Sequence, residues 1–157
     1  MHAHFRRLAP KLERTGAALK RLLPNRWGPN ASCPRLYAGI VRSMALYGAP
    51  VWAPNLMRRP TRALLTSQRV MAIRVIRGYR TISGEEANLL AGLLPWDLEA
   101  KVLARVFSLR ADACRRGETL LPRQISAWRD ELRRDLMAEW QQRLCRNRGL
   151  GSLSLQP

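Results

Sequence analysis

Few side chains in this sequence have the type and spacing that catalysis requires. Two-metal phosphoryl transfer needs clustered carboxylates that hold the cations, and the adjacent acidic pairs are Glu85-Glu86 and Asp130-Glu131. Both pairs lie in segments with helical spacing, where neighbouring side chains diverge by about 100°. His2 and His4 have no cysteine or histidine partner nearby, and no glycine-rich phosphate loop is present. We therefore predict no catalytic residue, no metal site and no cofactor in this chain, and we interpret the acidic pairs as capping and solvated-face residues.

The charge of the chain is its most informative global property. Its 157 residues carry 28 Lys+Arg against 11 Asp+Glu, a net charge of +17. Residues 1–80 hold 16 basic side chains and one acidic side chain, a net charge of +15. Residues 81–100 hold no basic and four acidic side chains, a net charge of −4. Residues 101–157 hold 12 basic and six acidic side chains, a net charge of +6. Such an excess suits a polyanionic partner, and we predict RNA or DNA.

Cysteine content and hydropathy bear on the compartment. The three cysteines, Cys33, Cys114 and Cys145, are an odd number with spacing that fits neither a disulfide framework nor paired zinc ligands. The longest charge-free apolar passage, residues 44–54, is far shorter than the ~20 residues of a membrane span. We predict an intracellular protein with reduced thiols and no membrane contact.

The spacing of apolar residues predicts helices along nearly the whole chain, and we expect an all-α fold of about six amphipathic helices. Proline and glycine residues supply most of the boundaries. Ser83 and Glu86 form a predicted capping box for a short helix that ends at Gly92. Residues 49–53 are the only weak strand candidate. The other predicted helices span residues 3–23, 34–47, 60–78, 95–117 and 122–148.

The segment after Pro60 separates apolar from cationic residues. Helical geometry places an apolar face on one side, made by Leu64, Gln68, Met71, Ala72 and Val75, and places Arg62, Arg69, Arg77 and Arg80 on the other. Residues 31–80 contain nine arginines and no carboxylate, which costs self-repulsion unless phosphates are near. We predict that this face, together with Arg74, contacts nucleic-acid phosphates, and that Arg6, Arg7, Lys11 and Arg14 form a competing N-terminal site.

Several short motifs resemble a known family. They are Arg21–Asn25, Leu36-Tyr37, Leu46–Ala53, Gln68-Arg69, Ala72–Thr81 and Leu90–Trp96, and they occur in this order. The pattern is similar to the region after the polymerase palm in reverse transcriptases of arthropod non-LTR (LINE-type) retrotransposons, especially the group that inserts into ribosomal DNA. The resemblance covers roughly residues 4–144 and is most specific over residues 46–96.

The resemblance implies a place within a larger RNA-directed DNA polymerase. It implies a thumb-like helical domain over residues 1–117 and a C-terminal helical extension or linker over 118–148. Residues 149–157 follow the last predicted helix, and we expect them to form a disordered tail. The thumb holds the template–primer duplex, while the palm and fingers, the missing partners, carry catalysis with Mg²⁺. The family's Phe/Tyr-X-Asp-Asp catalytic motif has no match in this sequence, so we expect a fragment that is not an enzyme by itself. If the chain is expressed, we expect it in the nucleus.

Two other classes of function remain open at this point. A stand-alone basic helical RNA- or DNA-binding protein would share the charge, although it would not need the ordered apolar motifs of residues 46–96. A helical protein-interaction module would use Trp128 and Trp140 as anchors on a partner. Tryptophans at helical spacing more commonly close a helical core.

Overall fold

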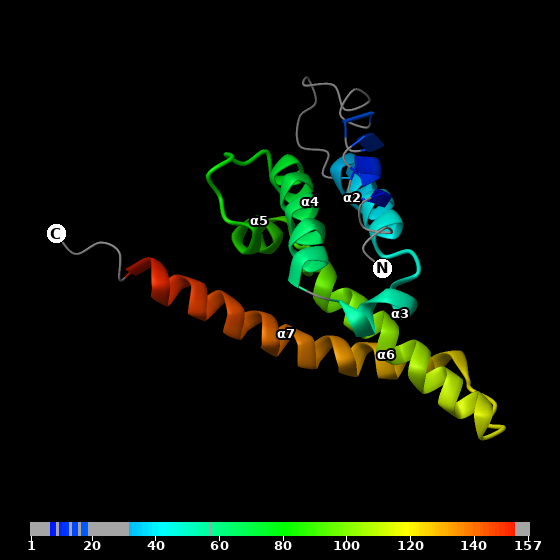
Figure 1. Ribbon diagram of the computed structural model, residues 1–157. Helices are drawn as coiled ribbons and strands as arrows, with labels where there is room; N and C mark the ends of the chain where they lie inside the picture. The colour runs from blue at the N-terminus through cyan, green and yellow to red at the C-terminus, as the bar shows by residue number, and fades with distance from the viewer. Residues whose placement is uncertain are drawn as a thin grey trace.

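The computed structural model describes residues 7–8, 10–12, 14–15, 17–18, 32–56 and 58–152, with side chains at 36–56 and 61–146 of the last two ranges. The elements are α2 (Ser32–Ala45), α3 (Ala49–Trp52), the 3₁₀ helix η1 (Ala53–Asn55), α4 (Arg58–Ile76), α5 (Gly84–Ala91), α6 (Trp96–Arg115) and α7 (Pro122–Ser152). Within these ranges there is no strand, which confirms the predicted all-α class (Figure 1).

The helix boundaries agree with the sequence predictions to within a few residues. The predicted helices 34–47, 60–78, 95–117 and 122–148 correspond to α2, α4, α6 and α7. Residues 149–152, predicted to begin the tail, continue α7, and residues 153–157 lie outside the described part of the chain. Within the predicted helix 3–23, the structure describes residues 7–8, 10–12, 14–15 and 17–18, and all of these are helical. The other residues of this predicted helix lie outside the described part of the chain.

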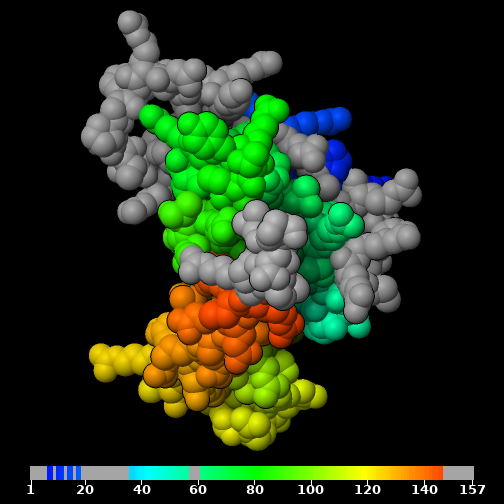
Figure 2. Space-filling view, turned by 90° about the vertical axis from the view of Figure 1, so that its left-hand side faces the viewer, coloured from blue at the N-terminus to red at the C-terminus, as the bar shows by residue number. Residues whose placement is uncertain are grey.

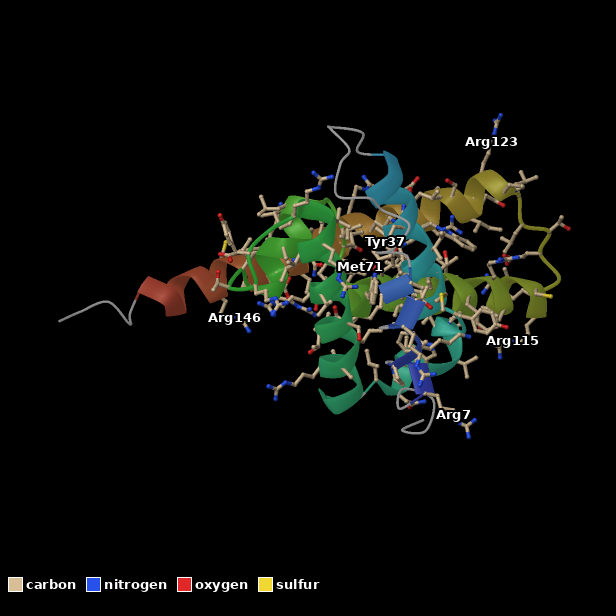
Figure 3. All side chains as sticks on the ribbon, turned by 90° about the horizontal axis from the view of Figure 1, so that it is seen from above. Arg7, Tyr37, Met71, Arg115, Arg123 and Arg146 are labelled. Atoms are coloured by element: carbon tan, nitrogen blue, oxygen red, sulfur yellow. The ribbon has the colours of Figure 1, made fainter. Side chains whose placement is uncertain are left out.

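The core lies where the N-terminal segment, α2, α4 and the start of α6 meet. Figure 3 shows Tyr37 of α2 and Met71 of α4 in the middle of this packing. The predicted apolar face of α4 is buried, because Leu64, Gln68, Met71 and Ala72 are each at most 2% exposed and Val75 is partly buried. The remaining buried cluster members include Leu8, Leu12, Val41, Ala45, Leu46, Ala49, Trp52, Trp96 and Ala100.

The predicted weak strand at residues 49–53 is wrong. Gly48 adopts a left-handed conformation, with φ of 68°, and ends the turn after α2. Pro50 then sits in the first turn of α3, where a missing N–H costs nothing. The indole Nε1 of Trp52 donates to the carbonyl of Tyr47 at 3.0 Å. This contact folds the segment back on itself as a helix, with Trp52 4% exposed.

Helix α4 ends earlier than its sequence predicts. The amide of Gly78 donates to the carbonyl of Ile73 at 2.9 Å, and that of Arg77 donates to Arg74 at 3.3 Å. This is a Schellman ending, but the left-handed position is held by Arg77, with φ of 53°. Gly78 serves a different purpose, because a Cβ there would lie 2.8 Å from the Ile82 side chain. The glycine therefore marks a close contact one residue beyond the left-handed turn.

Helix α5 is joined to α4 by polar contacts as well as packing. Ser83 and Glu86 form the predicted capping box, and Gly92 ends the helix with φ of 66°. The fully buried Gln68 of α4 donates from Nε2 to the carbonyl of Leu94 at 2.7 Å. Its Oε1 accepts from the amide of Trp96 at 2.8 Å. One side chain thus fixes the connection between α5 and α6.

The long helix α7 lies along α6 and is attached through charged side chains. Figure 2 shows α7 beneath the part of the molecule built from α4 and α5. Arg143 pairs with the buried Asp97 at 2.8 Å, and Lys101 pairs with Glu139 at 3.1 Å. Trp140 of α7 is only 4% exposed, and its indole donates to Glu85 of α5. The sequence prediction that this tryptophan closes a helical core is confirmed.

Acidic pH is expected to weaken the attachment of α7. Burial by itself would raise the pKa of Glu139, but the hydrogen bonds donated by Arg143 and Lys101 outweigh burial, and the pKa is lowered. A carboxyl group with a lowered pKa in the folded state stabilises the fold above its unfolded pKa, and this contribution is lost as pH falls through the folded value. The melting temperature should therefore differ between the native chain and Glu139→Gln at about pH 7 and converge toward about pH 3. Glu131→Gln, at an exposed position of the same helix, is the matched control. A difference that is independent of pH would contradict the assignment.

Candidate nucleic-acid interface

The four carboxylates of residues 81–100 are all bound within the fold. Glu86 takes part in the capping box of α5, and Asp97 pairs with Arg143. Glu99, 5% exposed, accepts from Arg42 Nε at 2.7 Å and from a second nitrogen of the same guanidinium. This hydrogen bond raises the pKa of Arg42 above its usual value. Glu85 accepts from the Trp140 indole at 2.6 Å. The acidic segment therefore binds partners in α2, α7 and its own helix cap, and among the described side chains it forms no ion pair with Arg62, Arg69 or Arg74 of α4.

The arginines predicted to contact nucleic acid fall into distinct environments. Arg62 and Arg74 are exposed on α4, and Arg80 is exposed in the connection that follows it. Arg77 is exposed at the left-handed end of the helix. No carboxylate forms an ion pair with Arg62, Arg74 or Arg80 among the described side chains, whereas Arg42, Arg133 and Arg143 all reach buried acids.

Arg69 has a structural role that the sequence prediction missed. Its Nε and Nη2 donate to the carbonyl of Ile82 at 2.9 and 2.8 Å, and Nη2 also donates to the carbonyl of Arg80. The side-chain stem packs against Gly84, where a Cβ would lie 3.5 Å from the Arg69 side chain. Arg69 therefore holds the connection between α4 and α5 and fixes the backbone that presents Arg80.

The predicted single helical face of four arginines is wrong in its geometry. That prediction requires helix through residue 80, but α4 ends at Ile76. Arg77 and Arg80 reach the surface from the turn and the connection that follow. Sequence periodicity does not reveal this because the left-handed residue of the turn is an arginine, and the glycine that usually marks such an ending comes one position later.

The N-terminal basic residues adjoin the α4 surface. Arg7, Lys11 and Arg14 are exposed, and Arg6 lies outside the described residues. Leu12, next to Lys11 in the chain, lines a small cavity of about 50 Å³ together with Tyr37, Met71 and Arg74. The N-terminal segment therefore packs near Arg74 through Leu12, while its basic side chains do not line this cavity.

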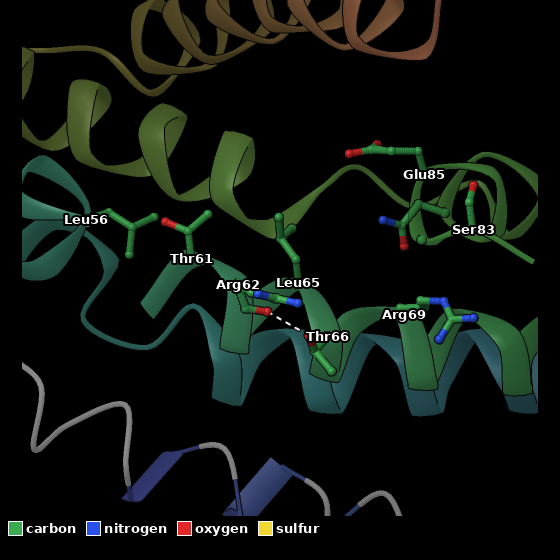
Figure 4. Close-up of a pocket in the computed structure, with 10 residues that line it drawn as sticks. Leu56, Thr61, Arg62, Leu65, Thr66, Arg69, Ser83 and Glu85 are labelled. Atoms are coloured by element: carbon green, nitrogen blue, oxygen red, sulfur yellow. Dashed lines mark hydrogen bonds between the residues drawn. The ribbon is translucent and has the colours of Figure 1, made fainter. Parts of the chain in front are cut away.

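A larger groove opens on the other side of α4, toward α5. It has a volume of about 560 Å³, and both Arg62 and Arg69 line it. Figure 4 shows Arg62, Thr66 and Arg69 along α4, across from Ser83 and Glu85 at the start of α5. The groove combines cationic, hydroxyl, carboxylate and apolar side chains, whereas Arg74 is the one charged residue that lines the small cavity on the other side.

Two further features bear on the sequence predictions. In the described part of the chain, no group of three or more His, Cys, Asp or Glu side chains could hold a metal ion. No described helix is both long and apolar enough to cross a membrane.

The two tryptophans of α7 differ from each other, because Trp128 is half-buried whereas Trp140 is buried and hydrogen-bonded to Glu85. Trp140 is thus engaged within the fold and does not present the exposed anchor that a protein-interaction module would use.

The relatives of this chain are proteins of arthropod retrotransposons. It is 29% identical over 148 residues to the 115 kDa protein of the type-1 retrotransposable element R1DM of Drosophila melanogaster, a match that covers 89% of this chain and 14% of the relative. It is 36% identical over 100 residues to the retrovirus-related Pol polyprotein from the R1 element of Bradysia coprophila, covering 62% and 10%. It is 28% identical over 138 residues to the Pol polyprotein from the R1 3 element of Nasonia vitripennis, covering 80% and 36%.

These matches confirm the family resemblance predicted from the sequence motifs. The homologues include Pol polyproteins of R1 non-LTR retrotransposons, and the chain corresponds to a part of such a polyprotein. It spans between about a tenth and about a third of the length of these three relatives. No protein-family profile and no solved structure matches the chain.

Proposed function

We propose that this chain is the thumb-like, post-palm part of a retrotransposon reverse transcriptase and holds a template–primer duplex through its basic surface. In this proposal the palm and fingers of the polyprotein supply the catalytic carboxylates and Mg²⁺. The chain itself contributes no catalytic residue. Its role is to bind phosphates and to keep the duplex in place.

The distribution of charge carries this proposal. The segment 31–80 has nine arginines and no carboxylate, and the acids that follow it are bound to Ser83, Trp140, Arg143 and Arg42. Among the described side chains, these acids form no ion pair with Arg62, Arg74 or Arg80. A uniformly cationic surface raises the free energy of the isolated fold by self-repulsion, and polyanion binding relieves that repulsion.

The contact surface that we assign consists of the exposed basic residues around the end of α4. Arg62 and Arg74 lie on the helix, Arg77 and Arg80 follow it, and the exposed Lys11 belongs to the N-terminal segment that packs near Arg74 through Leu12. Arg7 and Arg14 extend the surface along the N-terminal segment. Arginine and lysine bind backbone phosphates, and the sequence contains no recognisable base-reading motif, so the binding should depend little on nucleotide sequence.

The salt dependence of binding by the native chain tests this function. We expect the full chain to bind an RNA–DNA hybrid duplex with an affinity that falls by about 0.9 log units per log unit of salt for each phosphate neutralised. Fluorescence anisotropy over a range of salt concentrations measures that slope. Scrambling the duplex sequence should leave the affinity nearly unchanged. An affinity that is insensitive to salt would contradict the proposed use of the basic surface.

A further inference from the structure

The groove between α4 and α5 contains an unexplained buried polar atom. Asn88 of α5 lines the groove and is 3% exposed. Its Oδ1 has no hydrogen-bond partner in the described structure. A buried acceptor without a donor raises the free energy of the fold, and native proteins contain few of them. Because Oδ1 only accepts hydrogen bonds, the missing partner is a donor.

The other groove residues define what kind of donor would fit. Glu85 uses one carboxylate oxygen for the Trp140 indole, at 2.6 Å, which leaves Oε1 as a second acceptor. Leu56 and Leu65 supply apolar surface, and Thr61 and Ser83 supply hydroxyl groups. Arg62 is exposed and forms no ion pair with a described carboxylate. The groove thus offers acceptors for N–H groups, an apolar wall and a cation.

This combination excludes simpler ligands on chemical grounds. A bare phosphate would meet the Glu85 carboxylate and leave Asn88 Oδ1 without a donor. An amine alone would satisfy Oδ1 but would be repelled by Arg62 and Arg69. A nucleotide has all the complementary parts, because its base carries N–H donors and a flat apolar face and its phosphate carries negative charge. The volume of about 560 Å³ is within the range of pockets that hold small molecules.

We propose that the α4–α5 groove binds one unpaired nucleotide of a nucleic-acid strand. Because Asn88 Oδ1 is closed off from the groove in the free structure, the proposal requires the Asn88 side chain to turn on binding, so that Oδ1 accepts from the base amino group together with Glu85. The ring lies against Leu56 and Leu65, and the phosphate pairs with Arg62. This proposal rests on the proposed nucleic-acid contact of the α4 surface. It adds a site for a single base beside a surface that otherwise contacts only the backbone. Free nucleotides have the same chemistry, so the test must separate them from a strand.

The first arm of the test compares small ligands on the full chain. AMP and CMP, whose bases carry exocyclic amino groups, are titrated against ribose 5-phosphate and inorganic phosphate, and the side-chain amide NMR signals of Asn88 are followed. We expect AMP and CMP to bind about tenfold more tightly than ribose 5-phosphate, as the gain of hydrogen bonds at Asn88 and Glu85 implies. Equal affinities would overturn the proposal.

Variants then separate a ligand site from a structural asparagine. Asn88→Leu should lose the preference for AMP, and its melting temperature should be unchanged or higher, because the change removes an unpaired buried acceptor. Arg62→Gln should weaken AMP and ribose 5-phosphate alike. Arg105→Gln, at an exposed position of α6 outside the groove, should leave nucleotide affinity unchanged. A folded Asn88→Leu chain that binds AMP normally would contradict the proposal.

Two further measurements complete the design. If Asn88→Leu does not fold, Thr66→Trp serves instead, because Thr66 is exposed and lines the groove and an indole there should block AMP. A short single-stranded oligo(dA) should shift the Asn88 signals and compete with AMP, whereas failure to compete would overturn the strand assignment. The proposed duplex-holding function can fail independently of this site. In that case the chain would bind AMP but would show no salt-dependent binding of a duplex.

Discussion

Replacing Gln68 with leucine is expected to lower the free energy of unfolding by about 3 kcal/mol, since two buried hydrogen bonds are lost together. The Gln68 side chain donates to the Leu94 carbonyl and accepts from the Trp96 amide, and it is fully buried. Leucine fills a similar volume but leaves both backbone groups without partners. For a chain of this size, the melting temperature should fall by about 6–12 °C.

The control for this prediction is the same substitution at an exposed glutamine that makes no buried hydrogen bonds. Gln141 is exposed on α7, so Gln141→Leu should change the melting temperature little. Thermal unfolding followed by circular dichroism compares the two variants. Equal effects would show that the Gln68 contacts do not hold α4 to the connection before α6.

This contact also explains why particular sequence motifs occur together. Gln68 and Arg69 are adjacent on α4 but bind different segments, namely residues 94–96 and residues 80–82. The motifs Gln68-Arg69 and Ala72–Thr81 and the later motif Leu90–Trp96 are thus parts of one packed unit. Resemblance to a family can be recognised from such motifs before their physical connection is known.

The sequence predicts the helices well because their signals are local. Proline at the first turns of α3 and α7, the capping box at Ser83 and Glu86, and the left-handed glycines Gly92 and Gly117 each act within a few residues of the boundary they set. The apolar spacing of α4 also identifies the buried face. These features need no knowledge of the tertiary arrangement.

The candidate site is less predictable because it depends on contacts between distant residues. Glu85 and Trp140 are 55 positions apart, and Arg42 and Glu99 are 57 apart. The absence of basic residues at 81–100 is the only sequence signal that these acids find partners elsewhere. Similarly, the Arg69 guanidinium donates to the backbone carbonyls of Arg80 and Ile82 only because residues 77–83 leave the helix and fold back toward Arg69. The helix ends at Ile76, earlier than the periodicity of the sequence indicates.

Removing the exposed arginines of the α4 surface is expected to weaken duplex binding about a hundredfold, if each of three phosphate contacts contributes about 1 kcal/mol. The variant replaces Arg62, Arg74 and Arg80 with glutamine and leaves Arg69 in place, because Arg69 holds the α4–α5 connection. Glutamine keeps a polar side chain of helical propensity while removing the charge. The fold should therefore remain intact, which circular dichroism can check.

The matched control removes the same charge from another part of the molecule. Arg105, Arg110 and Arg134 are exposed on α6 and α7, and their replacement by glutamine gives the same net charge as the first variant. Any effect of total charge alone will be equal in both. A third variant, with glutamine at Arg7, Lys11 and Arg14, measures the share of the N-terminal segment. Because Leu12, and none of these three basic residues, lines the cavity beside Arg74, we expect the third variant to weaken binding less than the α4 variant.

The salt slope of RNA–DNA hybrid binding, compared between the α4 variant and the α6–α7 control, tests the proposed interface most directly. Each lost phosphate contact should reduce the slope by about one. We predict that the slope of the α4 variant is about three units shallower than that of the native chain, and that the slope of the control is unchanged. Equal slopes for the two variants would contradict the assignment of the nucleic-acid contact to the end of α4.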